Sequence, residues 1–189
     1  MRIAAASGAV ALVLAFAPSA SSSPAATPDS PAAIQPARQC VDLPKDAGIA
    51  ACRAALSLGL SQRRAGVLRD VLASKLAALG RWEEAVAVYR EAAAQPSAGA
   101  ETYVRLGSAL VHGVGRPEEA LPWLREAARI DPSNPGPWGV LGAALSALGR
   151  SGEAAAAFDE AVRRDPAWLE GRPASQAIAE AARKGEAWP

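Results

Sequence analysis

The chain has 189 residues, of which half are apolar but only 5% are aromatic, and much of the apolar share is alanine. Such a composition favours closely packed helices over a core built from strands. The 20 basic and 19 acidic residues leave a formal net charge of +1, whereas a nucleic-acid-binding surface needs a basic excess gathered on one face. The composition therefore predicts a helical protein and argues against nucleic acid as its partner.

Residues 1–20 have the form of a secretory signal peptide. Arg2 supplies a positive start, Ile3–Ala17 is apolar, and small residues suited to a cleavage site follow. The apolar run is about 15 residues long, whereas a membrane-spanning helix needs roughly 20. We therefore expect a cleaved signal, a periplasmic or secreted protein, and no membrane insertion after cleavage. The alternative is an uncleaved segment that anchors the chain to the membrane by its N-terminus.

Residues 21–39 are nearly all serine, proline, alanine and threonine, without apolar periodicity. A segment of this composition cannot bury enough apolar surface to fold, so we predict a disordered tether. The folded part is expected to begin near Cys40.

Cys40 and Cys52 are the only cysteines in the chain. An even pair of cysteines in an exported protein indicates a disulfide bond. Two thiols and one distant histidine do not complete a tetrahedral zinc site, so no metal is expected. The Cys-x-x-Cys spacing that is typical of redox pairs is also missing.

One ten-residue phrase recurs along the chain. It stands at Leu76–Ala85, again in a stretched form at Leu110–Ala120, and a third time at Leu145–Ala154. Equivalent apolar positions recur at intervals of 34 or 35 residues: Leu72, Leu106 and Leu141; Ala85, Ala120 and Ala154; Tyr89, Leu124 and Phe158. We attribute the longer interval to one extra residue in a loop at His112–Pro117. Glycines in the phrase (Gly80, Gly113 or Gly115, and Gly149) suit the end of a helix, so each phrase predicts the turn of a helical hairpin.

The pattern resembles the tetratricopeptide repeat, a helix–turn–helix unit of 34 residues. The third copy carries the family positions most fully: Trp138, Leu141, Gly142, Ala154, Phe158, Ala161 and Pro166. The second copy has Tyr103 in the tryptophan position, and the first has Arg69 there. The resemblance implies three units at residues 66–99, 100–134 and 135–168.

The segments on either side of the three units have the pattern of partial units. In residues 40–65, Gly48, Cys52 and Ala55 fall where the second helix of a unit has its small and large apolar positions. Residues 169–189 contain a single predicted helix and a tail. We therefore expect an all-α, right-handed solenoid of helical hairpins, with an N-terminal capping half-repeat and a C-terminal capping helix. A cysteine before the Ile49–Cys52 segment is also similar to the start of some exported bacterial proteins of this family.

No catalytic constellation is visible in the sequence. Ser108 and His112 lie on a predicted helix, without a strained nucleophile turn or donors for an oxyanion. The paired acids Glu83-Glu84 and Glu118-Glu119 fall in the first turns of predicted helices, where the helix dipole favours negative charge. We therefore expect a protein that is not an enzyme and that needs no cofactor.

The resemblance implies instead a concave groove that is lined by the first helix of each unit and holds segments of another protein. Ten residues should face this groove: Asp70, Val71, Ser74, Glu101, Val104, Arg105, Ser108, His112, Val140 and Ala143. Arg105 is the residue most expected to contact a bound chain, and its alternative role is an ion pair with Glu101. The lysines and asparagines with which some relatives clamp a terminal carboxylate are missing from these positions.

The sequence thus predicts a non-catalytic scaffold of the bacterial cell envelope that binds a partner protein. A module that binds envelope lipid or glycan is the alternative. The ten positions could also be ordinary solvated helix faces.

Overall fold

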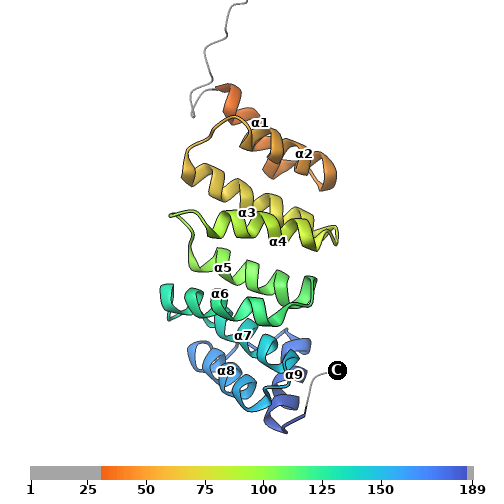
Figure 1. Cartoon of the computed structure of the whole chain (residues 1–189), viewed down its shortest axis with the longest axis vertical. Coiled ribbons are helices and arrows are strands. Elements are labelled where there is room, and N and C mark those ends of the chain that lie inside the picture. Colours follow the sequence, from red (N-terminus) through yellow and green to blue (C-terminus); the bar gives the residue numbers. More distant parts are fainter. Residues whose placement is uncertain (1–30, 187–189) are drawn as a thin grey trace, which may run out of the picture.

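The computed structural model describes residues 31–186, so the predicted signal peptide and residues 21–30 of the predicted tether lie outside the described residues. Within residues 31–186 the regular secondary structure is all helical, without strands, and the helices stack as hairpins in one row (Figure 1). Their bounds are α1 Pro31–Asp42, α2 Lys45–Leu56, α3 Gln62–Ala78, α4 Trp82–Ala93, α5 Ala100–Ser108, the π-helix η1 Ala109–Gly113, α6 Pro117–Ile130, α7 Pro135–Ala147, α8 Ser151–Arg164 and α9 Pro173–Arg183. The predicted all-α solenoid is confirmed.

The three central hairpins, α3–α4, α5–α6 and α7–α8, have the same type of turn between their two helices. Gly80, Gly115 and Gly149 end the first helix of each hairpin with φ of 73°, 66° and 71°. This left-handed conformation is cheap only for glycine, which explains why the sequence phrase recurs. Gly113, the other candidate in the second hairpin, instead lies inside η1.

Small and large side chains alternate across each hairpin. A Cβ atom on Gly107 would lie 2.5 Å from Leu124, and one on Gly142 would lie 2.8 Å from Phe158. Leu124 and Phe158 are fully buried. The two helices of the second and third central hairpins therefore approach closely because the first helix offers no side chain where the second places a large one.

The N-terminal segment differs from the expectation. Residues 31–39, predicted to be tether, belong to helix α1, and α1 with α2 forms a complete hairpin in place of a half-repeat. Pro31 stands at the first position of α1, where a missing N–H costs nothing. Cys40, near the other end of α1, is fully buried in the core. Tertiary contacts of this kind stabilise a helix that the local composition does not favour.

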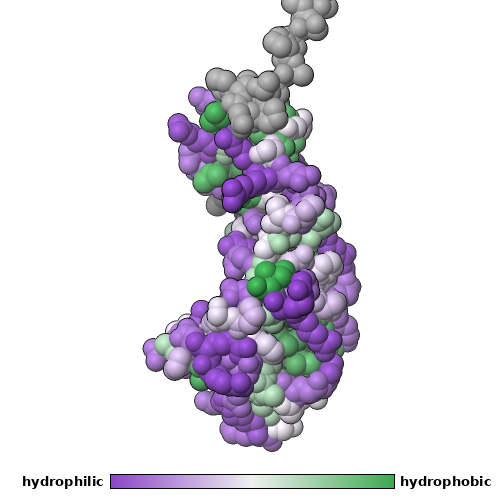
Figure 2. Space-filling model, turned by 90° about the vertical axis from the view of Figure 1, so that its left-hand side faces the viewer, coloured by the Kyte–Doolittle hydropathy of each residue, from purple (hydrophilic) through white to green (hydrophobic). Residues whose placement is uncertain are grey.

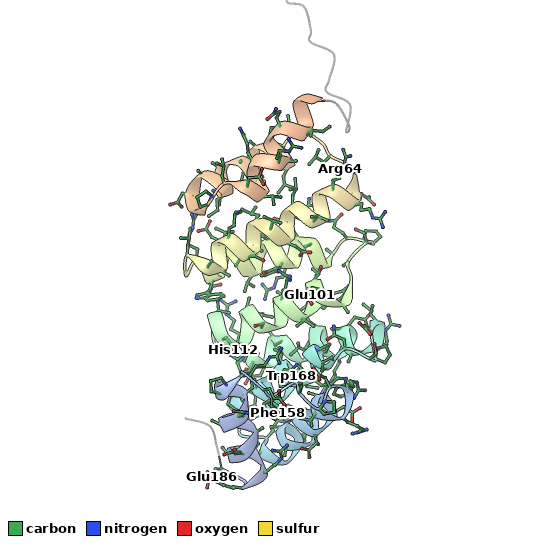
Figure 3. All side chains as sticks on the ribbon, turned by 180° about the vertical axis from the view of Figure 1, so that it is seen from behind. Arg64, Glu101, His112, Phe158, Trp168 and Glu186 are labelled. Carbon is green, nitrogen blue, oxygen red and sulfur yellow. A yellow bond between two sulfur atoms is a disulfide. The ribbon has the colours of Figure 1, made fainter. Side chains whose placement is uncertain are left out.

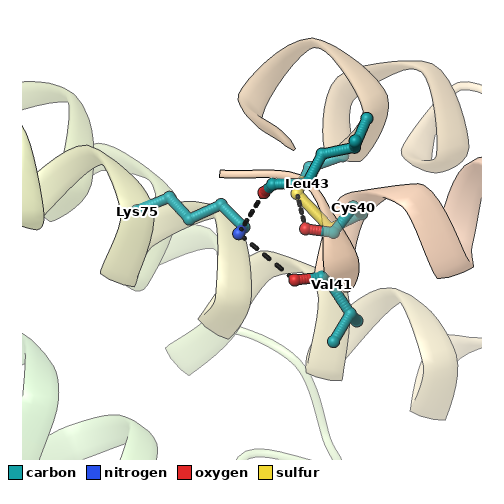
Figure 4. Close-up of a disulfide and its surroundings, with 5 residues drawn as sticks. Cys40, Val41, Leu43 and Lys75 are labelled. Atoms are coloured by element: carbon teal, nitrogen blue, oxygen red, sulfur yellow. Dashed lines mark hydrogen bonds between the residues drawn. A yellow bond between two sulfur atoms is a disulfide. The ribbon is translucent and has the colours of Figure 1, made fainter. Parts of the chain in front are cut away.

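A covalent bond and a lysine hold this hairpin in place. Cys40 and Cys52 form a disulfide, with their Cα atoms 4.4 Å apart. Lys75 of α3 reaches across and donates from Nζ to the carbonyl oxygens of Leu43 at 2.7 Å and Val41 at 3.4 Å (Figure 4). The turn between α1 and α2 is thereby attached to the first central hairpin.

The extra residue of the second hairpin lies in a helix, not in the predicted loop. Across η1 the N–H of Val114 donates to the carbonyl of Ala109, five residues earlier, at 3.1 Å. The N–H of Arg116 then donates to Leu110, six residues earlier, where its counterparts in the other hairpins reach back five. A π-helical turn absorbs one residue without breaking the helix, so the following turn keeps its place.

The C-terminal end carries a small core of its own. Trp168, in the turn after α8, packs on α7 so closely that a Cβ on Gly139 would lie 1.9 Å from its ring. Ile178 and Ala179 of α9 join Phe158 and Trp168 in this cluster. Helix α9 thus covers the last face of the solenoid, as a capping helix should.

Candidate functional site

The solenoid is bowed along its length. Figure 2 shows it from the side, with one long face hollowed. Figure 3 shows the molecule from behind, with α3 and α5 in front and Glu101 near the start of α5. These two helices carry most of the residues predicted to face a groove.

A cavity of about 530 Å³ lies between α3 and α5. It is lined by Val67, Asp70, Val71, Ser74, Lys75, Ala78, Glu101 and Arg105. The residues from α3 recur at helical spacings of three and four, which places them on one side of that helix. Valine and alanine side chains make part of the wall apolar, and charged groups face it from both helices.

Two further cavities adjoin the first through shared residues. One, of about 390 Å³, also contains Val67, Asp70 and Glu101 in its lining and extends to the loop between α4 and α5. The other, of about 250 Å³, shares Ser74 and Arg105 and extends toward Trp82, Tyr89 and Ser108. We call these three adjoining cavities the α3–α5 groove.

Arg105 is held by neighbours inside the groove. Its Nε donates to Glu101 Oε1 at 2.9 Å, and its terminal nitrogen donates to Ser74 Oγ at 3.0 Å. The hydroxyls of Ser74 and Tyr89 lie 3.1 Å apart and form a further hydrogen bond. The ion pair with Glu101 that was the alternative role for Arg105 is therefore formed, and Arg105 ties α5 to α3.

Asp70 is the half-buried acid of the groove. Its carboxylate accepts a hydrogen bond from Thr102 Oγ1, at 3.2 and 3.4 Å to its two oxygens. Burial raises the pKa of Asp70 above its ordinary value, and the Thr102 hydrogen bond and the charge of Arg105 oppose that rise.

Six of the ten predicted groove residues line these cavities: Asp70, Val71, Ser74, Glu101, Arg105 and Ser108. Ala143 does not, because it is only 8% exposed and belongs to the C-terminal core with Ile178 of α9. The expectation for Ala143 is therefore wrong: α9 covers the face of α7 that the repeat pattern leaves open.

Val104, Val140 and His112 also lie outside the linings of the three cavities. Val140 is half-buried and packs against the main core. His112 lies at the end of the second hairpin in η1 (Figure 3), and desolvation lowers the pKa of its imidazole.

The sequence prediction of site residues did not include Lys75, Ala78 or Thr102. Ala78 continues the three-and-four spacing of Val71 and Ser74, so the helical pattern could have identified it. The contact of Thr102 with Asp70 joins two hairpins, and no local pattern indicates it.

The paired acids have structural partners. Glu84 accepts from Arg81 at 2.6 Å and from Arg53 at 2.9 Å, and the hydrogen bond from Arg81 lowers the pKa of Glu84. Glu83 pairs with Arg116 of the next hairpin at 2.5 Å.

Among residues 31–186, histidine, cysteine and acidic side chains nowhere gather in a group of three that could hold a metal ion. In the same range no helix combines the length and the apolar character that crossing a membrane requires.

Comparison of the chain with models of known protein families gives two matches. Two family models, both described as tetratricopeptide repeat, match residues 71–135 and 111–179, which together span more than half of the chain. No curated protein sequence matches the chain significantly.

Solved structures resemble the fold at low sequence identity. The Arabidopsis OM64 TPR domain superposes with a TM-score of 0.59 at 23% identity, covering 66% of this chain and 98% of that one. YrrB, described as a TPR protein with an unusual peptide-binding site, gives 0.55 at 20%, covering 73% and 76%. MamA of Desulfovibrio magneticus RS-1 gives 0.56 at 16%, covering 82% and 89%. The repeated glycine turns and the small-to-large packing agree with the two matching family models. The chain therefore belongs to the tetratricopeptide repeat family.

Proposed function

We propose that this protein is a non-catalytic scaffold that binds an extended segment of a partner protein in the α3–α5 groove. The observation that carries the proposal is the continuity of the groove, because neighbouring cavities share Asp70 and Glu101 on one side and Ser74 and Arg105 on the other. An extended chain advances about 3.3 Å per residue, so a string of adjoining cavities suits successive side chains of one segment. The peptide-binding site named for YrrB, a protein of similar fold, supports the same kind of ligand.

We also propose that the protein acts in the cell envelope after export. The disulfide between Cys40 and Cys52 supports this proposal, because such bonds persist mainly in oxidising compartments. The intact mass of the protein recovered outside the cytoplasm should correspond to a chain that starts between about residues 20 and 26, since signal cleavage requires small residues. Recovery of the full-length chain from the cytoplasm would contradict export.

Site-specific photocrosslinking in the producing cells tests the groove. A benzophenone amino acid would replace Val67, which lines the groove and is 57% exposed, or Ile130, which ends α6 outside it and is 41% exposed. The Val67 position should give discrete protein adducts that the Ile130 position does not give. Adducts of equal pattern at both positions, or none at Val67, would contradict the proposal, and adducts to lipid or glycan alone would favour an envelope-ligand module.

A further inference from the structure

Asp70 lies where two parts of the groove meet. It lines both the cavity of about 530 Å³ and the cavity of about 390 Å³, and Val67 and Glu101 line both with it. A bound chain can therefore reach Asp70 from either cavity.

The hydrogen-bonding capacity of Asp70 is mostly unused. An ionised carboxylate offers about four acceptor sites. Among the described residues, Asp70 accepts from one hydroxyl, that of Thr102. Thr102 is itself buried, so this contact lies on the inner side of the carboxylate.

The cations that line the larger cavity are already occupied. Arg105 donates to Glu101 and Ser74, and Lys75 donates to the carbonyl oxygens of Leu43 and Val41. Arg63, an exposed side chain, lines the smaller cavity with Asp70. The groove therefore offers a bound chain an acid with free acceptor sites, and its two inner cations are engaged in contacts within the protein.

We infer that the α3–α5 groove selects a partner segment that carries a lysine or arginine side chain, which donates to Asp70 while small apolar residues beside it contact Val67 and Val71. This inference rests on the function proposed above and names the chemistry of the partner. Burial already disfavours the charged form of this carboxylate, and a cation that donates to it would offset that cost.

Selection from a displayed library of random nine-residue peptides tests the inference. The bait is the immobilised full chain, and a second selection uses Asp70→Asn. Asp159→Asn is the matched control, because it removes the same charge from α8, outside the linings of the groove cavities. Peptides selected by the wild type should carry a lysine or arginine at one position, and the Asp70→Asn selection should lose that preference.

A double-mutant cycle on one selected peptide then isolates the contact. Fluorescence anisotropy should show that Asp70→Asn weakens binding by about tenfold or more, the loss expected for a hydrogen-bonded charged pair. Changing the basic residue of the peptide to glutamine should cost as much, and the two changes together should cost little more than either alone. Asp159→Asn should bind within about twofold of the wild type, because the charge that it removes is far from the contact and is screened by salt.

The outcomes separate this inference from the function on which it rests. Selected peptides that lack a basic residue, or that bind wild type and Asp70→Asn equally, would overturn the inference and leave a peptide-binding groove. Peptides that prefer an acidic residue would also overturn it. The variant Val71→Arg fills the groove and should abolish binding of the selected peptides. If no peptide is selected, or if the selected peptides still bind Val71→Arg, both the inference and the proposed function are overturned. Acetylation of the peptide at its N-terminus alone, with any lysine side chain left free, should leave binding unchanged; loss of binding would mean that the groove captures the free amino terminus and would overturn the inference.

Discussion

At the scale of single residues, glycine decides how closely the helices of this solenoid approach. The first helix of the third unit carries Gly139 under the ring of Trp168 and Gly142 under Phe158. Glycine inside a helix costs roughly 0.5–1 kcal/mol relative to alanine. Here the close packing of two large aromatic side chains offsets that cost.

Gly139 therefore separates packing from helix propensity. Gly139→Ala would place a Cβ 1.9 Å from the Trp168 ring, so we expect the free energy of unfolding to fall by about 1–3 kcal/mol despite the better propensity of alanine. Gly152→Ala, on the open surface of α8, should leave it unchanged or raise it by up to about 1 kcal/mol. Urea denaturation of both variants measures this, and equal effects would contradict the packing argument.

Asp70 gives a prediction of opposite sign for stability and binding. Burial raises its pKa in the folded chain, so the folded state holds the proton more tightly than the unfolded state does. The stability associated with this group is therefore fully present below its unfolded pKa and is lost as the pH rises through the raised folded pKa.

Asp70→Asn should remove that dependence. At neutral pH its free energy of unfolding should equal or exceed that of the wild type, and the difference should shrink on acidification to about pH 4, near the ordinary range of an aspartate. Denaturant titrations across this pH range measure it. If Asp70→Asn is less stable than the wild type at neutral pH and this deficit disappears at acid pH, the charge of Asp70 stabilises the fold and the prediction is wrong.

At the scale of elements, η1 shows how the solenoid accepts an extra residue. The π-helical turn lets Gly115 and Arg116 form the same turn as in the other hairpins, although this hairpin is one residue longer. The ring of Trp82 packs on this turn, where a Cβ on Gly113 would lie 2.5 Å away. The insertion is thus held by a contact from the preceding hairpin.

Deletion of His112 should convert η1 into a regular helical turn. The flanking apolar residues keep their register after the deletion, so the free energy of unfolding should change by about 1 kcal/mol or less. The midpoint of thermal unfolding should therefore shift little. Deletion of the fully buried Ala144 in α7 is the control, because it rotates every later side chain of α7 away from its partner. Circular dichroism melts should show a large loss for the control alone, and equal losses would mean that η1 is required.

At the scale of the whole molecule, each hairpin contacts its neighbours along the row. Ion pairs repeat across these junctions, as with Arg53–Glu84 between α2 and α4 and Arg116–Glu83 between the first two central hairpins. They are exposed and contribute little individually. Stability is instead the sum of hairpin cores and their interfaces, so damage at one end should stay near that end.

Ile178 of α9 tests this locality. Ile178→Asp places an unpaired charge where the side chain is 7% exposed, which we expect to cost about 3 kcal/mol or more. Hydrogen exchange should then accelerate in α7–α9 while α3 and α4 keep their protection. Ala174→Asp lies at an exposed position in the first turn of the same helix, where an acid suits the helix dipole. It should change neither the stability nor the hydrogen exchange of α7–α9. Uniform loss of protection along the chain would indicate one cooperative unit.

The sequence by itself determined the three central hairpins, because the repeat is written in local patterns. Glycine at the turns and alternating small and large positions specify a helix–turn–helix whatever surrounds it. It also indicated the pairing of Cys40 with Cys52 and, on the α3 side of the groove, Asp70, Val71 and Ser74, since spacing along a single helix shows which residues share a face.

Only the tertiary structure decided features that depend on contacts between elements. Helix α1 forms in a proline-rich segment because Cys40 is buried against α2, and Ala143 is closed off because α9 lies over α7. Arg105 of α5 is also held by Ser74 of α3, and Asp70 of α3 accepts from Thr102 of α5, because the two helices lie side by side. Periodicity reports which side of a helix a residue is on, whereas partners and burial depend on what packs against that side.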